Sequence, residues 1–357
     1  MTPKLRRSLG LTLVELMVSL AIGAALMLVG ATLFLNSRQS YVQDEQAAYV
    51  QEVGRYSLRF LSRELGLAGF MGGVQQPELI KVEQTLLNGA ELAPSSSCYH
   101  LLLNVPEGLS HYNNVTEQGL ETDGNGTATG RSLPPDCFSD SETLMQGSDV
   151  VVVRRVKDSP TVIQGGEQAS VNASATYLSI VRYNELFALN TGAASNLADD
   201  ETSVDTWSET DLWEYMPQLL YVRVRNPGQC ASDTYETVEL CRLRLNQSGS
   251  GLAPTQCLVE GVERINVVYG LDTDDDLFVD MFTEQPTPAE LENAISARLT
   301  VLARSDQTDS RYIDDKSYEL GSVTFTPSAD ENSCNDRIRR SMFGSTVLLR
   351  NMDAVGL

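Results

Sequence analysis

The stretch RRSLGLTLVELMVSLAIGAALMLVGATLFL, residues 6–35, decides how this chain is organised. Its last twenty residues, from Leu16 to Leu35, carry no charge. An α-helix of that length rises about 30 Å, which matches the hydrocarbon core of a bilayer. The basic residues Lys4, Arg6 and Arg7 precede the run, and such an excess places the N-terminus in the cytoplasm. The stretch therefore predicts one transmembrane helix, with the rest of the chain on the other side of the membrane.

One acidic residue, Glu15, stands directly before the uncharged run and five residues after Gly10. A carboxylate in hydrocarbon is costly, roughly 2.5 to 3.5 kcal/mol for Asp at the centre of an inserted helix, so it needs a partner. Cleavage after Gly10 would give Leu11 a free α-amine near Glu15, and a neighbouring subunit can also supply one. An uncleaved signal anchor leaves Glu15 unexplained, and a secretory signal peptide has a shorter apolar region of about 7 to 15 residues.

The segment GLTLVE, from Gly10 to Glu15, resembles the cleavage site of a type IV prepilin. Leu11 departs from the usual pattern, in which this position is phenylalanine. The resemblance implies that a dedicated prepilin peptidase cuts after Gly10 and methylates the new N-terminus at Leu11. It also implies that Glu15 guides subunits into a filament.

The helix is expected to continue beyond the membrane. Apolar residues recur at the spacing of one helix face, and most charged residues fall elsewhere. The apolar residues are Val42, Tyr49, Val53, Tyr56, Phe60 and Leu67. Glycines from Gly66 onward end this pattern, which gives a helix roughly 85 Å long. The chain thus divides into a leader (residues 1–10), a transmembrane and amphipathic helix (residues 11–66) and a periplasmic globular body (residues 67–357).

The body contains short runs rich in β-branched or alternating apolar residues, which are typical of strands. They are LLLNV from 101, DVVVVRRV from 149, ATYLSIVRY from 175, LLYVRVRN from 219, TVELCRLRL from 237, ERINVVYGL from 263 and ARLTVLARS from 297. Thr287 as cap and Pro288 in the first turn predict a helix within residues 286–298. Residues 107–135 and 192–210 are expected to be long polar loops. The predicted fold is α+β, a long N-terminal helix packed on an antiparallel sheet.

All six cysteines follow the membrane segment, on the oxidising side, where an even number indicates disulfides. They are Cys98, Cys137, Cys230, Cys241, Cys257 and Cys334. Cys98 with Cys137 is the favoured pair, and Cys241 and Cys257 flank a hairpin loop. The spacings fit no common zinc pattern. The remaining connectivity stays open.

An acidic segment, GLDTDDDLFVD, resembles part of a calcium loop. Asp272, Asp274, Asp276 and Asp280 match positions one, three, five and nine of that loop. Leu277 replaces its turn glycine and Thr283 its closing glutamate, so the match is incomplete. Calcium is the one cofactor that the sequence suggests, and an ordinary acidic surface turn is the alternative.

The overall charge and the histidines limit the possible functions. A formal net charge of −22, which loss of the basic leader makes still more negative, argues against binding nucleic acid. The two histidines, His100 and His111, form no metal pattern, and no GxSxG, Walker or dinucleotide motif is present. The chain is therefore expected not to be an enzyme.

Four segments of the body resemble PilW-type minor pilins of type IVa pili: QGSDVVVVRR, LVEGVERINVVYGLDTDDD, ISARLTVLARS and DRIRRSMFGSTVLLRNM. The resemblance implies a scarce subunit of the bacterial inner membrane, and then of the pilus tip. Its partners would be other minor pilins, the major pilin and a large tip adhesin. The implied roles are priming of pilus assembly, display of the adhesin, twitching motility and adhesion. A pseudopilin of type II secretion shares the leader, Glu15 and the helix, and is the alternative.

Overall fold

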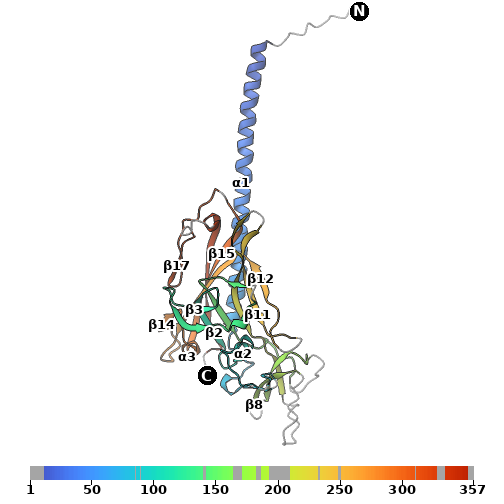
Figure 1. Ribbon diagram of the computed structural model, residues 1–357, viewed down its shortest axis with the longest axis vertical. Coiled ribbons are helices and arrows are strands. Elements are labelled where there is room, and N and C mark those ends of the chain that lie inside the picture. Colours follow the sequence, from blue (N-terminus) through green and yellow to red (C-terminus); the bar gives the residue numbers. More distant parts are fainter. Residues whose placement is uncertain are drawn as a thin grey trace, which may run out of the picture. The chain divides into compact units, whose positions relative to one another are not determined.

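The structure is a computed structural model that describes residues 12–84, 86–88, 90–139, 142–163, 171–181, 186–192, 210–231, 234–247, 251–309, 311–327 and 334–352. The chain forms two compact units, Met1–Tyr49 and Val50–Leu357, whose boundary falls inside the first helix. Helix α1 runs from Leu13 to Gly66, so its C-terminal end agrees with the glycine signal in the sequence. Figure 1 shows this helix and the strands of the body.

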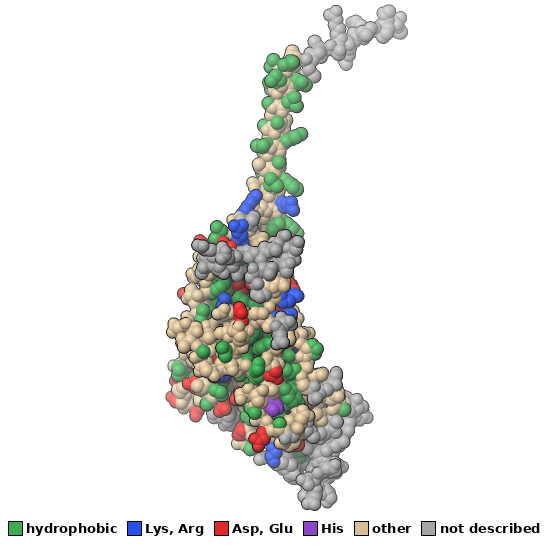
Figure 2. Space-filling view, viewed as in Figure 1, with side chains coloured by type: hydrophobic (Ala, Val, Ile, Leu, Met, Phe, Trp, Pro, Cys, Tyr) green, Lys and Arg blue, Asp and Glu red, His purple; other side chains and the backbone are tan. Residues whose placement is uncertain are grey.

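The first unit consists of the N-terminal part of α1. Its large apolar side chains are exposed, from Leu13 at 74% to Leu35 at 57% exposure. Figure 2 shows apolar side chains along the face of this helix that is in view. A window of α1 reaches a mean hydropathy of 2.3, and none of it is buried against protein. The helix therefore has the length and composition to cross a membrane, as the sequence predicts.

The second unit contains the last turns of α1, whose buried face differs from the predicted stripe. The buried apolar residues of this part are Val50, Val53, Leu61 and Leu65. Tyr56, which the spacing places on the buried face, is 47% exposed. The buried face of α1 differs from the predicted one because Gly54 lies against the Phe343 ring. A Cβ at this position would overlap the aromatic carbons. A small residue thus determines which side of the helix meets the body.

Two sheets make up most of the body. The larger has the order β12-β11-β10-β6-β2, with β5 also paired to β10. Its strands are β12 (Gln256–Glu260), β11 (Thr234–Arg244), β10 (Gln218–Ala231), β6 (Ser148–Val153), β2 (Leu109–Val115) and β5 (Thr143–Leu144). The second has the order β14-β13-β15-β18, with β14 (Met281–Thr283), β13 (Val262–Leu271), β15 (Ala294–Thr308) and β18 (Ile338–Leu348). Both sheets are antiparallel throughout.

Three smaller sheets complete the strands of the described residues. One has the order β1-β8-β7-β9, and β16-β17 and β3-β4 form hairpins. Their bounds are β1 (Lys81–Val82), β8 (Leu186–Thr191), β7 (Thr176–Val181), β9 (Thr210–Glu214), β16 (Tyr318–Leu320), β17 (Val323–Phe325), β3 (Leu120–Thr122) and β4 (Ala128–Ser132). Strands β1 and β8 pair in parallel, whereas the other strand pairs among the described residues are antiparallel.

Most of the predicted strands are present, but two expectations were wrong. The run LLLNV from 101 forms the end of helix α2 (Cys98–Leu103). Leucine favours helix over strand, and the Ser97 side chain caps the helix by accepting a bond from the His100 N–H. The segment 107–135 is no long loop, because it contains β2, β3 and β4. Residues 193–209 of the other predicted loop lie outside the described part of the structure.

The predicted helix near Pro286 is helix α3 (Pro288–Glu292). Thr287 is its N-cap, and the Glu290 carboxylate accepts a bond from the Thr287 N–H, which completes a capping box. The helix is shorter than the sequence segment suggested, since β15 begins already at Ala294. Short 3₁₀ turns, η1 (Pro77–Leu79), η2 (Pro135–Cys137) and η6 (Cys334–Arg337), connect other elements.

Candidate functional site

Glu15 lies in the first turn of α1, where it forms a capping box with Thr12. One Glu15 carboxylate oxygen accepts bonds from the Thr12 N–H and hydroxyl, both at 3.1 Å, and the Glu15 N–H donates to the Thr12 Oγ1 at 3.2 Å. This geometry holds the carboxylate beside the backbone that follows Leu11 and leaves the side chain exposed. Gly10 and Leu11 themselves lie outside the described residues. The acid is thus hydrogen-bonded to Thr12, the residue that follows Leu11 in the sequence.

The hydroxyls within the apolar part of α1 are bonded to the helix itself. Ser19 donates to the Glu15 carbonyl at 2.7 Å, and Thr32 donates to the Val29 carbonyl at 2.8 Å. Each hydroxyl therefore has an acceptor without water, which suits a helix surrounded by lipid or by other apolar helices.

A buried ion pair attaches the end of α1 to the sheets of the body. Glu64 accepts bonds from the Arg155 guanidinium, at 2.9 Å from Nε and 3.3 Å from Nη2, and also from the Gln218 amide. The Glu64 side chain is only 7% exposed. Sequence analysis missed this residue, because a charged residue in an amphipathic helix usually faces solvent. The helix is therefore tied to β10 and to the residues just after β6 by charge as well as by apolar contact.

The favoured disulfide is present, and the two cysteines that flank the hairpin, whose pairing the sequence left open, form a second one. Cys98, at the start of α2, is bonded to Cys137 in η2, with Cα atoms 4.8 Å apart. Cys241 of β11 is bonded to Cys257 of β12, with Cα atoms 3.9 Å apart. These sulfurs are therefore not available as metal ligands, although Glu239 lies close to the second pair. The side chains of Cys230 and Cys334 lie outside the described part of the structure.

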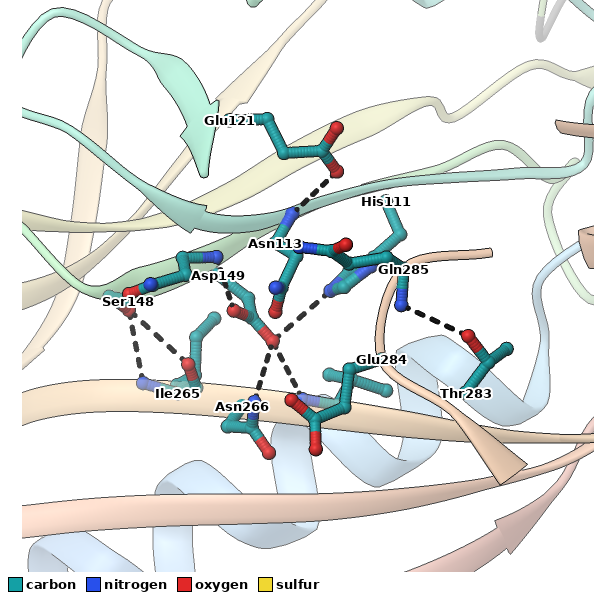
Figure 3. A network of polar contacts seen from close by, with 12 residues as sticks. His111, Asn113, Glu121, Ser148, Asp149, Ile265, Asn266, Thr283, Glu284 and Gln285 are labelled. Atoms are coloured by element: carbon teal, nitrogen blue, oxygen red, sulfur yellow. Dashed lines mark hydrogen bonds and ion pairs between the residues drawn. The ribbon is translucent and has the colours of Figure 1, made fainter. Parts of the chain in front are cut away.

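Asp149 joins the two large sheets through a buried network (Figure 3). Its carboxylate accepts bonds from His111 Nε2 at 3.1 Å, from the Asn114 N–H at 2.9 Å and from the Val267 N–H at 2.8 Å. His111 has no exposed surface, and its ring meets Tyr269 edge-on at 5.1 Å. Burial raises the pKa of Tyr269 well above its usual value. The arrangement links β2 and β6 to β13, which is a structural role for this histidine.

A second buried charge network lies on the strands β13, β15 and β18. Glu263 accepts bonds from Arg340 Nε at 2.6 Å and Nη2 at 2.9 Å, and Asp314 accepts one from Arg340 Nη1 at 3.2 Å. Burial opposes ionisation of Glu263, but the Arg340 and Arg304 guanidiniums outweigh it and lower the pKa to about 2. The Glu263, Arg340 and Asp314 charges are thus paired with one another, which is a structural role for this network.

The aspartate loop between β13 and β14 brings together three of the four predicted ligands. Single carboxylate oxygens of Asp272, Asp274 and Asp276 lie within 4.8 Å of one another. The charges of Asp276 and Asp280 raise the pKa of Asp274, as expected where like charges converge. Asp280 is not part of the converging set, because its carboxylate accepts bonds from the Thr273 N–H and hydroxyl at 2.8 and 2.7 Å. Calcium binding stays a prediction.

Comparison with protein families gave two matches, at different parts of the chain. Residues 5–31 match the prokaryotic N-terminal methylation motif, and residues 220–351 match the family of the type IV pilus-assembly protein W. The second match covers β10 to β18, including the aspartate loop. Comparison with curated proteins and with solved structures gave no match. The matches point to a structural pilus component and not to an enzyme. The two matches together are consistent with a PilW-type minor pilin of a type IV pilus.

Proposed function

We propose that this protein is a minor pilin of the tip complex of a type IV pilus. In this proposal it primes pilus assembly and supports the display of a large adhesin, and hence twitching motility and adhesion. The prepilin peptidase processes it at Gly10 and Leu11 in the inner membrane, where its body is periplasmic. It then leaves the membrane with other minor pilins and the major pilin.

The observation that carries this proposal is the combination of a bare apolar helix and a body attached to its end. The exposed side chains from Leu13 to Leu35 have no partner within the first unit, and a bundle of pilin helices offers an apolar surround equivalent to lipid. Glu15, oriented by Thr12 at the start of that helix, is positioned to pair with the N-terminal amine of a neighbour. The buried pair of Glu64 and Arg155 ties the last turns of α1 to the strands of the body.

The test is recovery of the full-length protein in pili sheared from cells. We expect the wild type to be present in a small amount relative to the major pilin. Glu15→Ala should be inserted and cleaved normally but depleted from sheared pili, because it lacks the carboxylate for a neighbouring amine. Val18→Ala, an equally exposed position within the same helix, is the matched control. Normal recovery of the Glu15 variant would contradict the proposed role of this acid.

The alternative is a pseudopilin of a type II secretion system, since such a protein shares the leader and helix. Deletion distinguishes the two proposals. Loss of surface pili and twitching with normal secretion of exoproteins supports the minor pilin. Loss of secretion with normal pili supports the pseudopilin.

A further inference from the structure

The loop that joins β13 to β14 presents two consecutive large apolar side chains to solvent. Leu277 is 63% exposed, and Phe278, at 72%, is the most exposed large apolar side chain among the described residues of the second unit. We call these two residues the apolar tip. The loop adjoins β14, which is labelled beside α3 in Figure 1. Exposed apolar side chains that lie together are a mark of interaction surfaces.

The backbone of this loop is held firmly in the conformation that projects the tip. Both carboxylate oxygens of Asp272 are used: they accept bonds from the N–H groups of Asp274, Asp276 and Leu277, the last at 2.6 Å. The Phe278 N–H donates to the Asp276 carboxylate at 2.9 Å. The exposure of the tip therefore belongs to a hydrogen-bonded turn and not to a frayed segment.

The turn also keeps Leu277 in a backbone conformation that leucine rarely adopts. Its φ is +67°, in the left-handed region that favours glycine or asparagine. Glycine at this position would relieve the strain and remove the exposed side chain at the same time. The next apolar residue, Val279, turns inward and would meet a Cβ added at Gly270. In a surface turn with no binding role, glycine at position 277 would be less strained than leucine. The leucine therefore indicates a docking role for this side chain.

The charges around the tip indicate the chemistry of its partner. Four exposed acidic residues flank it, Asp274, Asp275, Asp276 and Asp280. We propose that the apolar tip inserts into an apolar pocket with a basic rim on another component of the pilus. A second copy of this chain would bring the same acidic rim, and an anionic lipid surface would repel the loop. This inference rests on the proposed function, because the partner is taken from the same assembly.

Photo-crosslinking from the full-length chain in piliated cells tests the proposal. The photoreactive residue benzoylphenylalanine replaces Phe278, and in a matched control it replaces Ile313, which is 65% exposed elsewhere on the body. We expect a crosslink from position 278 to one pilus component, identified by mass spectrometry, and none to that protein from position 313. Equal crosslinking from both positions, or crosslinking to lipid from position 278, would overturn the proposal.

Two substitutions, each added to the chain that carries benzoylphenylalanine at position 278, distinguish a loss of docking from a loss of folding. Leu277→Gly relieves the backbone and should leave the thermal unfolding temperature unchanged or higher, yet reduce the crosslink about tenfold, as for an interface hot spot. Asp275→Asn also tolerates the left-handed backbone and should reduce the crosslink by weakening the attraction to a basic rim. A Leu277→Gly chain that crosslinks as well as the parent contradicts docking by the tip.

The outcome can be distinguished from failure of the proposed function. If position 278 gives no specific crosslink while the wild type is recovered in sheared pili and Glu15→Ala is depleted, the tip inference fails and the minor pilin role stands. If the wild-type protein itself is not recovered in sheared pili, the proposed function fails.

Discussion

Glu64 of α1 and Arg155, which follows β6, form a buried ion pair with the Arg155 Nε 2.9 Å from the carboxylate. The two residues are far apart in the sequence, and only Arg155 lies in a segment that resembles the pilin family. Gln218 of β10 donates to the same carboxylate, so three elements meet at one acidic group. The part of α1 that belongs to the second unit is thereby fixed to the centre of the larger sheet.

The first prediction concerns this pair. Glu64→Ala should lower the free energy of unfolding of the body by about 3 to 5 kcal/mol, because Arg155 would be left buried without its carboxylate. Arg59→Ala, at an exposed position of the same helix, is the control and should change stability by less than about 0.5 kcal/mol. Urea unfolding of the full-length protein in detergent measures both. Equal stability of the two variants would show that the pair contributes little.

The second prediction concerns the close approach of α1 to β18. Gly54→Ala should destabilise the body by about 1 to 3 kcal/mol, because the added Cβ overlaps the Phe343 ring. Adding Gly54→Ala to a Phe343→Ala chain should be harmless, since the ring is then gone. Gly23→Ala is the matched control, because nothing lies within 4 Å of a Cβ at that glycine. A double-mutant cycle by thermal unfolding would reveal a coupling near zero if the contact were absent.

The third prediction concerns processing of the leader. Gly10→Val should block cleavage, because a branched side chain crowds the peptide bond that the peptidase must reach. Intact-mass measurement of the membrane-bound protein should then give the precursor. Leu11→Phe, which restores the usual residue of prepilins, is the control and should be cleaved. A mature mass from the Gly10 variant would refute the assigned cleavage site.

The fourth prediction concerns calcium. Titration calorimetry of the full-length protein should show weak binding, with a Kd of about 10⁻⁴ to 10⁻³ M, because the loop supplies few of the usual oxygen ligands. Asp274→Ala should abolish the heat, because it removes one of the three converging carboxylates. Asp275→Asn should keep it, since Asp275 is not among the three residues whose oxygens converge. No heat at millimolar calcium would remove this site from consideration.

The fifth prediction concerns acid stability. The pKa of Glu263 is lowered from 4.5 to about 2 in the folded chain. A group with a lowered folded pKa contributes stability that is present above its unfolded pKa and is lost as pH falls through the folded value. The unfolding temperature should therefore fall between about pH 4.5 and pH 2. Glu263→Gln should start lower at neutral pH and show a shallower fall in this range, and an unchanged slope would exclude Glu263 as the cause.

The elements that local chemistry determines could be predicted from the sequence. The uncharged run predicted the apolar helix, and Thr287 and Pro288 predicted the start of α3. The run from Asp149 predicted the buried strand β6. The cysteines flanking the hairpin of β11 and β12 gave a disulfide, because antiparallel pairing brings such residues together. Each of these signals lies within a short segment.

The parts that the sequence did not predict depend on residues outside the patterns. The buried face of α1 was misassigned at Tyr56, because the small residue Gly54 and the charged residue Glu64 face the body instead. Asp280 fits a ligand position by spacing, but the spacing did not predict that its carboxylate accepts bonds from the Thr273 N–H and hydroxyl. The run from Leu101 forms a helix because Ser97 caps it, although its apolar residues also suit a strand. In each case a neighbour outside the pattern decides the outcome.

The contact between Gly54 and Phe343 also has a consequence for biogenesis. Helix α1 is the first helix among the described residues, and β18, which carries Phe343, is the last strand among them. The surface of α1 around Gly54 therefore lacks its partner on β18 until the ribosome has made the chain as far as Phe343. A chaperone that recognises apolar helices would have its opportunity during that interval.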